Sequence, residues 1–464
     1  MVKKNKLIQS IFAVGILSFL GIVIETALNI AYPRLMINFN VSARTVQWLT
    51  TGYMLVSTVI IPFGSFLKKR FKTISLFRVA VFCFLLGTVC AGLTSKFSLL
   101  LFGRLLQGVA DGIGLPLMFS IILEQAPKNQ VGIFMGIGTL VIAFAPAVGP
   151  VYGGIILKYL SWQFLFIFIV PLIIATWLLG EFSITQSQMT KKPLFDFKGG
   201  IALTGFLLST LLLILTFTTN TNLVKQLVLA AITLITGLAF AYIENHSDSP
   251  ILDISLFKNL DFDLFLISFF LLQLMSLSMS FLIPNVLQIA FKQSTATSAI
   301  LILPAAIIDA VVSAVAGIIY DKVNKNLPII LGTGVICSTF LVMKLLNTSI
   351  NIMVLGYIIF MVGLGLSYSN IMTLSLSKLN LTVKDDGNVI YMTAQSYSGA
   401  IGTALAASII ALEQSKFYIK AVGNLNGFKL NIDILFFFSL IVFFCITVNL
   451  FYVSLHMKKS KKDI

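Results

Sequence analysis

Residues 102–117 read FGRLLQGVADGIGLPL and lie within an apolar stretch, about 99–123, that is long enough to cross a bilayer. Positions i, i+3 and i+7 share one face of an α-helix, so Arg104, Gln107 and Asp111 form a single polar stripe. A charged residue at the membrane centre costs about 2.5–3.5 kcal/mol unless it faces a wet cavity or a partner. The stretch therefore predicts a membrane helix whose polar face has a function.

The composition extends this prediction to the whole chain. Its 464 residues are 58% hydrophobic and 11% charged, with a mean hydropathy of +1.00, whereas soluble domains carry about 25% charge. Apolar runs of about 20 residues recur from end to end, which predicts an all-α polytopic membrane protein. The expected spans are 7–32, 46–67, 74–94, 98–123, 131–157, 161–181, 199–219, 222–243, 262–284, 296–320, 327–346, 351–376, 388–413 and 432–455.

Basic residues in the connections predict the orientation. An even number of spans puts both termini on one side, and that side carries about twice as many Lys and Arg residues as the other. We therefore expect both termini in the cytoplasm. The basic surplus would face anionic lipid headgroups, so no nucleic-acid partner is expected. Lysine strongly outnumbers arginine, as in A/T-rich bacterial genomes, which favours a bacterial cytoplasmic membrane.

The longer connections predict how the spans are grouped. Connections at about 182–198 and 244–261 bracket the seventh and eighth spans and mark that pair as an insert between two six-helix halves. The predicted units are 1–181, the insert 182–261, and 262–464. Two further long connections are 377–387 and 414–431. The second is extracellular by this count, and its Lys, Gly and Asn residues favour a linker over a lid.

The fifth span ends in the motif APAVGPVYGG at residues 145–154. Prolines remove backbone hydrogen bonds and bend a helix, while glycines permit close helix contact. The motif residues are Pro146, Gly149, Pro150, Gly153 and Gly154. This run resembles the antiporter motif of exporters in the major facilitator superfamily.

Further motifs occur in the order that this family shows. Arg104-x-x-Gln107-Gly108 resembles its fourth-span motif. Matches to the drug:proton antiporters with fourteen spans are Thr26, Asn29, Ala31 and Pro33 in the first span, Trp162, Phe166 and Pro171 in the sixth, Phe195-Asp196-Phe197-x-Gly199 before the seventh, Glu244, Pro250, Ile251, Leu252, Asp253 and Phe257 after the eighth, and Gln395, Gly399 and Gly402 in the thirteenth. The resemblance implies the major facilitator fold and transport by alternating access.

Two departures from the family pattern affect the expected machinery. Glu25 lies one residue away from the family's usual first-span acid, which rotates it by about 100°. The loop after the second span has Lys68 or Lys69 where the family has an acid, whereas Asp321 and Lys322 keep the pattern after the tenth span. We therefore expect a cytoplasmic gate formed by Asp321 and Lys322 and present on one side alone.

Four ionisable residues lie deep inside spans: Glu25, Arg104, Asp111 and Asp309. Counted from the outer helix ends, Glu25 and Arg104 lie about 10–12 Å deep and both aspartates about 18–20 Å deep. The interpretation is an upper site that tunes or relays a proton and a lower site that meets cargo near the midplane. A fixed ion pair or a bond to backbone is the alternative for each acid, and a structural role is favoured for Arg104.

Polar residues on the expected inner helices complete the candidate cavity, although helix-to-helix hydrogen bonding is an equal alternative for each. They are Asn29, Gln107, Gln273, Asn285, Asn370 and Gln395. The sequence thus favours a proton-coupled antiporter that exports amphipathic, typically cationic drugs or toxic compounds. The alternative is a proton-coupled transporter of an endogenous lipid, peptide or metabolite. No spacing typical of an enzyme, metal or cofactor site is present, and a passive channel fits the two halves poorly.

Overall fold

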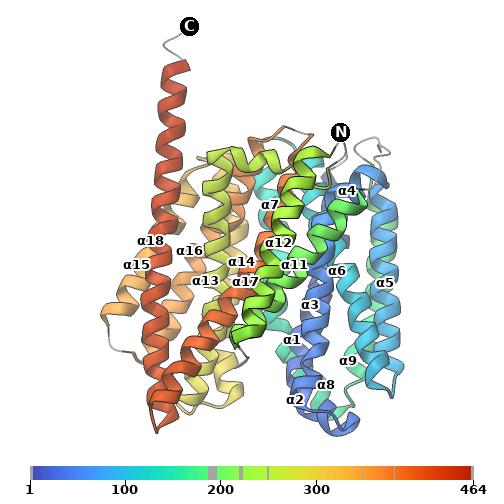
Figure 1. The fold of residues 1–464 in the computed structure, drawn as a ribbon, viewed down its shortest axis with the longest axis vertical. Helices are drawn as coiled ribbons and strands as arrows, with labels where there is room; N and C mark the ends of the chain where they lie inside the picture. The colour runs from blue at the N-terminus through green and yellow to red at the C-terminus, as the bar shows by residue number, and fades with distance from the viewer. Residues whose placement is uncertain are drawn as a thin grey trace.

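The computed structural model describes residues 4–186, 196–218, 223–247, 250–346, 348–380 and 382–460. These residues form helices and connections with no strand, and the long helices run side by side in one bundle (Figure 1). Within the described ranges, thirteen helical stretches are long and apolar enough to cross a membrane. The remaining expected span, 388–413, lies inside the 33-residue helix α17, whose polar residues lower its hydropathy. The all-α polytopic prediction is confirmed.

The helices before residue 186 form a first group around α1. They are α1 (Lys4–Phe39), α2 (Ala43–Val46), α3 (Trp48–Ile60), η1 (Ile61–Phe63), α4 (Gly64–Arg70), α5 (Thr73–Leu93), α6 (Phe97–Gln125), α7 (Val131–Ala143), α8 (Ala145–Tyr159), α9 (Phe164–Ile167) and α10 (Val170–Ser183). Helix α6 packs against α1, α3 and α5, so the polar stripe of the fourth span lies inside this group.

The helices after residue 250 form a second group of the same kind. They are η2 (Ile254–Lys258), α13 (Leu260–Ile289), α14 (Thr295–Lys322), α15 (Leu327–Leu345), α16 (Ile350–Ser377), α17 (Lys384–Lys416) and α18 (Lys420–Ser460). Helix α16 packs against α13, α14 and α15, and α17 packs between α13 and α18. We call the end of the bundle where α1 begins and α18 ends, at the top of Figure 1, the terminal face.

The two groups meet near the terminal face. Helix α7 packs along α14 and α16, where glycines allow the backbones to approach closely. A Cβ atom at Gly136 would lie 2.7 Å from the Ser313 carbonyl oxygen, and one at Gly317 would overlap Gly132. On the other side of the interface, η1, α4 and α6 contact α17.

The groups diverge away from the terminal face. The expected fifth span is divided at Phe144 into α7 and α8, and α8 packs mainly along α1 of its own group rather than along α14. The break follows from the prolines of the antiporter-like motif, which lack the backbone N–H that a continuous helix would use at this point. The structure is therefore closed between the groups at the terminal face.

The expected insert forms a hairpin of α11 (Phe197–Thr218) and α12 (Leu223–His246), which lies across the front of Figure 1. Helix α11 contacts both α3 and α17, so it covers the seam between the two groups on that side. The Tyr397 hydroxyl donates a hydrogen bond to the Leu207 carbonyl in this contact.

At the start of α11, the Gly199 backbone N–H donates to Asp196 at 2.9 Å and holds the pKa of that carboxyl below its usual value. Phe195, matched to the same motif, lies outside the described residues.

Two expected connections are shorter than the sequence indicated. The 414–431 connection was expected to be a linker, but α17 continues to Lys416 and α18 begins at Lys420. The Asn431 side chain, inside that expected linker, donates to the Gly427 carbonyl at 2.8 Å and is buried. The 377–387 connection likewise ends early, because α17 begins at Lys384. Glycine and asparagine are typical of loops but also occur within helices. Their presence alone therefore gave the wrong helix boundaries at these two connections.

Candidate functional site

The Arg104 side chain is fully buried between α3, α5 and α6. Its Nε donates to the Leu49 carbonyl at 3.2 Å, and its Nη1 donates to Gln107 Oε1 at 2.6 Å. Gln107 in turn donates to Thr88 at 2.8 Å. The guanidinium also lies 4.2 Å from the centre of the Tyr53 ring, within the range of a cation–π interaction. The upper part of the polar stripe is therefore a packed network inside the first group.

Glu25 on α1 and Asp111 on α6 are only partly buried. The Ser57 hydroxyl donates to the Asp111 carboxylate at 2.7 Å. The charge of Arg104 acts on both acids, but no ion pair among the described residues joins Arg104 to either of them. Arg104 therefore acts on one acid from each of the expected upper and lower sites.

Asp309 lies in the second group, on the face of α14 that packs against α16. A Cβ atom at Gly365 would lie 3.1 Å from its Oδ1 atom, so this glycine makes room for the carboxylate. The buried Tyr357 and the partly buried Tyr368 are close enough to interact with its charge, and the Tyr368 ring stacks on Phe269 with centroids 4.2 Å apart. None of the ion pairs in the described ranges includes Asp309. The second group thus holds a partly exposed acid without a cation of its own.

The other cavity candidates occupy different environments. Asn29 is exposed, Gln273 and Gln395 are partly buried, and Asn370 is fully buried, with its Nδ2 donating to the Leu366 carbonyl at 2.8 Å. Asn285 accepts a hydrogen bond from Asn424 of α18 at 2.7 Å. The described contacts therefore give Asn285 and Asn370 helix-to-helix or local hydrogen bonds, and they leave Gln273 and Gln395 with partly accessible side chains.

The antiporter-like motif presents two different faces of α8. Gly149 and Gly153 face α1, where the backbone of Ala27 comes within 3.0 Å of a Cβ placed at Gly153. Pro146 and Gly154 are exposed on other faces, and Pro150 is partly buried inside the helix. The two buried glycines allow α8 to pack closely against α1.

Replacing Gly149 by valine is expected to abolish transport, and replacing Gly154 by alanine to leave it unchanged. A Cβ at Gly149 would overlap Thr26 Oγ1 and lie 2.7 Å from the Val23 carbonyl oxygen, whereas one at Gly154 has no atom within 4 Å. Overpacking costs about 1–3 kcal/mol, which corresponds to about a tenfold to hundredfold loss of the state that needs this contact. The measurement is the uptake rate per folded protein in membrane vesicles. Equal activity of both variants would contradict a structural role for the α1–α8 contact.

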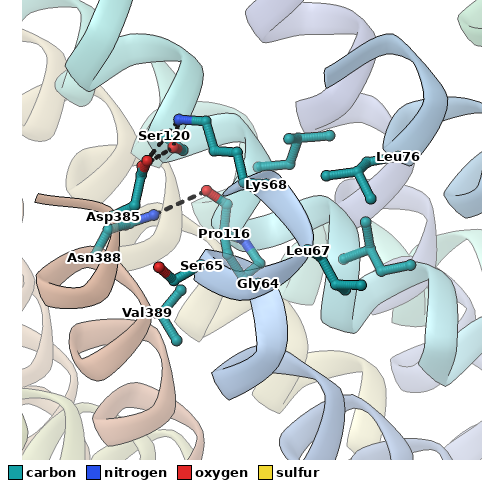
Figure 2. Close-up of a pocket in the computed structure, with 12 residues that line it drawn as sticks. Gly64, Ser65, Leu67, Lys68, Leu76, Pro116, Ser120, Asp385, Asn388 and Val389 are labelled. Atoms are coloured by element: carbon teal, nitrogen blue, oxygen red, sulfur yellow. Dashed lines mark hydrogen bonds and ion pairs between the residues drawn. The ribbon is translucent and has the colours of Figure 1, made fainter. Parts of the chain in front are cut away.

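A second cluster of charges joins the two groups at the terminal face (Figure 2). The Lys68 ammonium lies 2.6 Å from Glu124 of α6 and 2.9 Å from Asp385 of α17. Ser120 lies between them, accepting from Lys68 and donating to Asp385. All four side chains are buried or partly buried, so this network is shielded from water.

The next residue along each helix forms a similar lysine–aspartate–serine contact. Lys69 pairs with Asp386 at 2.9 Å, and Ser65 donates to the same carboxylate. Asn388, one turn into α17, donates to the Pro116 carbonyl of α6 at 2.9 Å, as Figure 2 shows. A small pocket lies between these contacts. We call Lys68, Lys69, Asp385 and Asp386 the terminal-face lock.

The expected gate residues lie on the other side of the same interface. Asp321, at the end of α14, accepts from the backbone N–H groups of Gly132 at 3.1 Å and Ile133 at 2.7 Å. A carboxylate at a helix N-terminus is favoured by the unpaired N–H groups and the helix dipole. Lys322 is exposed. The expectation of a gate on one side alone is wrong. The loop after the second span lacks the family's acid, but Lys68 and Lys69 of that loop form ion pairs with Asp385 and Asp386 of α17.

Sequence reasoning missed the residues that complete both clusters. Tyr53 and Ser57 lie one turn apart on α3 and contact the stripe, but neither is charged. Asp385 and Asp386 were assigned to a connection, although adjacent acids at a helix start are a helix signal. The two lysines found where the family has an acid are a further signal, because buried lysines require acidic partners from another part of the chain.

Comparisons with known proteins agree with this architecture. Residues 12–403 match the sequence profile of the Major Facilitator Superfamily. The chain is 35% identical over 399 residues to the uncharacterized MFS-type transporter YhcA of Bacillus subtilis, covering 84% of this chain and 74% of that one. It is 31% identical over 417 residues to the lincomycin resistance protein LmrB of Listeria innocua, covering 87% of each. The human organic anion transporter MFSD10 has a similar fold, with a TM-score of 0.64 and 12% identity over 93% of this chain and 99% of that one.

The helical bundle and its polar interior define a multi-pass membrane protein with a transporter fold. The chain belongs to the Major Facilitator Superfamily.

Proposed function

We propose that this protein is a proton-coupled antiporter that exports amphipathic, typically cationic toxic compounds across a bacterial cytoplasmic membrane. The observation that carries the proposal is the set of acids inside membrane helices of both groups. Glu25, Asp111 and Asp309 are partly accessible inside membrane helices, and Arg104 is the basic residue that acts on the first two. Acids in this position are costly unless they bind protons or cations.

Exchange follows from the chemistry of such a site. Burial favours the neutral form of a carboxyl group, so an acid of this kind binds a proton unless a cation replaces it. The site therefore holds a proton or a cationic compound in turn. The resistance protein LmrB, to which the chain is similar over most of its length, supports a toxic compound as the cargo.

Alternating access would come from a rocking motion of residues 1–181 against residues 262–464, with 182–261 as an insert at their seam. The terminal face carries the basic excess, which supports a cytoplasmic location for it. With that orientation, the contacts between the groups close the cytoplasmic side, as in an outward-facing state. The terminal-face lock and the α7–α14 contact are the parts that must open for cargo to enter.

Purified protein in liposomes is expected to take up a lipophilic cation, tetraphenylphosphonium, when a pH gradient is imposed, and to release protons as it does so. The measurement combines radiolabelled uptake with an entrapped pH dye. A nigericin-treated control collapses the pH gradient. Uptake that survives this collapse would refute proton coupling. Failure of a panel of cationic and neutral toxins, with uptake of a lipid or peptide instead, would favour an endogenous cargo.

A further inference from the structure

The Tyr53 hydroxyl is a buried polar group that neither packing nor the network described above explains. The side chain is 2% exposed, and its hydroxyl makes no well-formed hydrogen bond among the described residues, although it lies close enough to the Asp111 carboxyl to interact with it. A buried hydroxyl left unpaired costs about 1–3 kcal/mol relative to a paired one. A phenylalanine would fill the same space without that cost.

The positions of two glycines direct this hydroxyl toward α1. A Cβ atom at Gly21 would lie 2.8 Å from the Tyr53 hydroxyl oxygen, so the hydroxyl occupies the space that a side chain would take. Gly21 and Glu25 are one helical turn apart and share a face of α1. A Cβ at Gly108 would lie 2.6 Å from the Tyr53 carbonyl oxygen, so α6 also approaches α3 at this residue. The hydroxyl therefore lies where α1, α3 and α6 converge.

The two acids of the first group flank this point. Asp111 on α6 is bonded to Ser57, which is one turn from Tyr53 on the same face of α3. Both Asp111 and Glu25 are within interaction range of Tyr53. The Arg104 guanidinium lies over the ring of the same tyrosine at 4.2 Å, and in the described part of the chain its Nη2 atom is buried without a hydrogen-bond partner. Tyr53 thus packs beside Arg104 and lies within electrostatic range of both acids.

We infer that the Tyr53 hydroxyl carries a proton between Glu25 and Asp111, so that the two acids exchange protons as one unit. In each step the hydroxyl oxygen accepts a proton from one carboxyl group while its own proton passes to the other carboxylate. One proton moves, and the tyrosine is neutral before and after. Arg104, held by Leu49 and Gln107, stabilises the single negative charge that remains on the pair. This inference rests on the proposed function.

Tyr53→Phe tests the inference, because it keeps the ring under Arg104 and removes the hydroxyl alone. Two rates are measured in liposomes: uptake of tetraphenylphosphonium driven by a pH gradient, and exchange of internal for external tetraphenylphosphonium without a gradient. Exchange does not need net proton transfer. We expect driven uptake to fall by about tenfold or more, within the range of lost proton-transfer groups, while exchange changes by less than about twofold. The pH profile of driven uptake is expected to shift as well.

Tyr391→Phe is the matched control, since Tyr391 is also fully buried but lies in the second group against Phe262 and Phe269. It is expected to leave both rates unchanged. Unaltered driven uptake in Tyr53→Phe would overturn the relay, and so would an equal fall in uptake and exchange, which indicates a structural effect. The unsubstituted protein is measured first, and absence of driven uptake there would refute the proposed function itself.

Discussion

Export of lipophilic cations is expected to be lost when Asp309 is replaced by asparagine. Asparagine has nearly the same shape, so the space beside Gly365 is still filled, but the negative charge is removed. Among the described residues, the acids of the first group share Arg104, whereas Asp309 has no basic partner. A cationic cargo would therefore gain more from Asp309 than from an acid that is already compensated.

The expected magnitude follows from one charge-assisted contact. Such a contact is worth about 1.5–3 kcal/mol, so the apparent affinity for tetraphenylphosphonium is expected to fall by about tenfold to a hundredfold. Uptake of neutral amphipathic compounds is expected to change much less, because they gain nothing from the charge. Binding to detergent-purified protein, measured by isothermal titration calorimetry, separates affinity from transport rate.

Asp433→Asn is the control for this experiment. Asp433 is an acid of the same group on α18, but it is exposed and already paired with Lys344 at 3.2 Å. The substitution is expected to leave cation binding unchanged. If Asp309→Asn and Asp433→Asn bind tetraphenylphosphonium as tightly as the unsubstituted protein, Asp309 is not the cation site.

Reversing one charge of the terminal-face lock is expected to separate the two groups at that face. Asp386→Lys places a second ammonium beside Lys69, and Lys69→Asp places a second carboxylate beside Asp386. Asp386 is 1% exposed, so either change leaves like charges at a largely buried site. Lys69 remains about one third exposed, and screening reduces the expected cost to about 1–3 kcal/mol.

The lock joins the groups in this closed arrangement, so its loss acts on the equilibrium between conformations. A change of about 1–3 kcal/mol shifts that equilibrium by about tenfold to a hundredfold. The measurement is the distance distribution between spin labels at the exposed residues Lys72 and Lys325, one in each group, in protein without its native cysteines. Each single reversal is expected to increase the population of longer distances, and the double exchange Lys69→Asp with Asp386→Lys to restore the original distribution.

The ion pair of Lys378 with Asp261, 2.6 Å apart, is a matched control because both residues belong to the second group. Asp261→Lys is expected to leave the distance distribution unchanged. A double exchange that behaves like the single reversals would show that the lysine–aspartate contact does not hold the groups together.

Much of the fold was predictable because bilayer thickness fixes the length of a spanning helix. The spans around α5, α6, α13 and α16 begin and end within a few residues of their predicted positions. The prediction failed at 414–431, where most of the expected linker forms the end of α17 and the first turns of α18. Composition has no information on tertiary packing, in which Asn424 donates to Asn285 of α13 and Asn431 donates to the Ala406 carbonyl of α17.

The site was predictable in its residue types but not in its grouping. Hydrocarbon makes each intramembrane charge costly, so Glu25, Arg104, Asp111 and Asp309 could be identified from sequence alone. Which charges act on one another depends on contacts between helices that are far apart in the chain. The lysines at 68 and 69 are paired with acids more than 300 residues away, and no local pattern specifies that partner.

By itself, the sequence determined that this protein is a helical membrane protein with acids in its interior and a bent fifth span. Each of these follows from the chemistry of a single segment in hydrocarbon or from proline and glycine within one helix. Only the tertiary structure decided that Arg104 acts on both Glu25 and Asp111, that Tyr53 packs beside Arg104, and that Lys68 and Lys69 pair with acids of α17 at the terminal face. These arrangements depend on how glycine-rich faces let α1, α3, α6 and α17 approach, which is a property of the packed bundle.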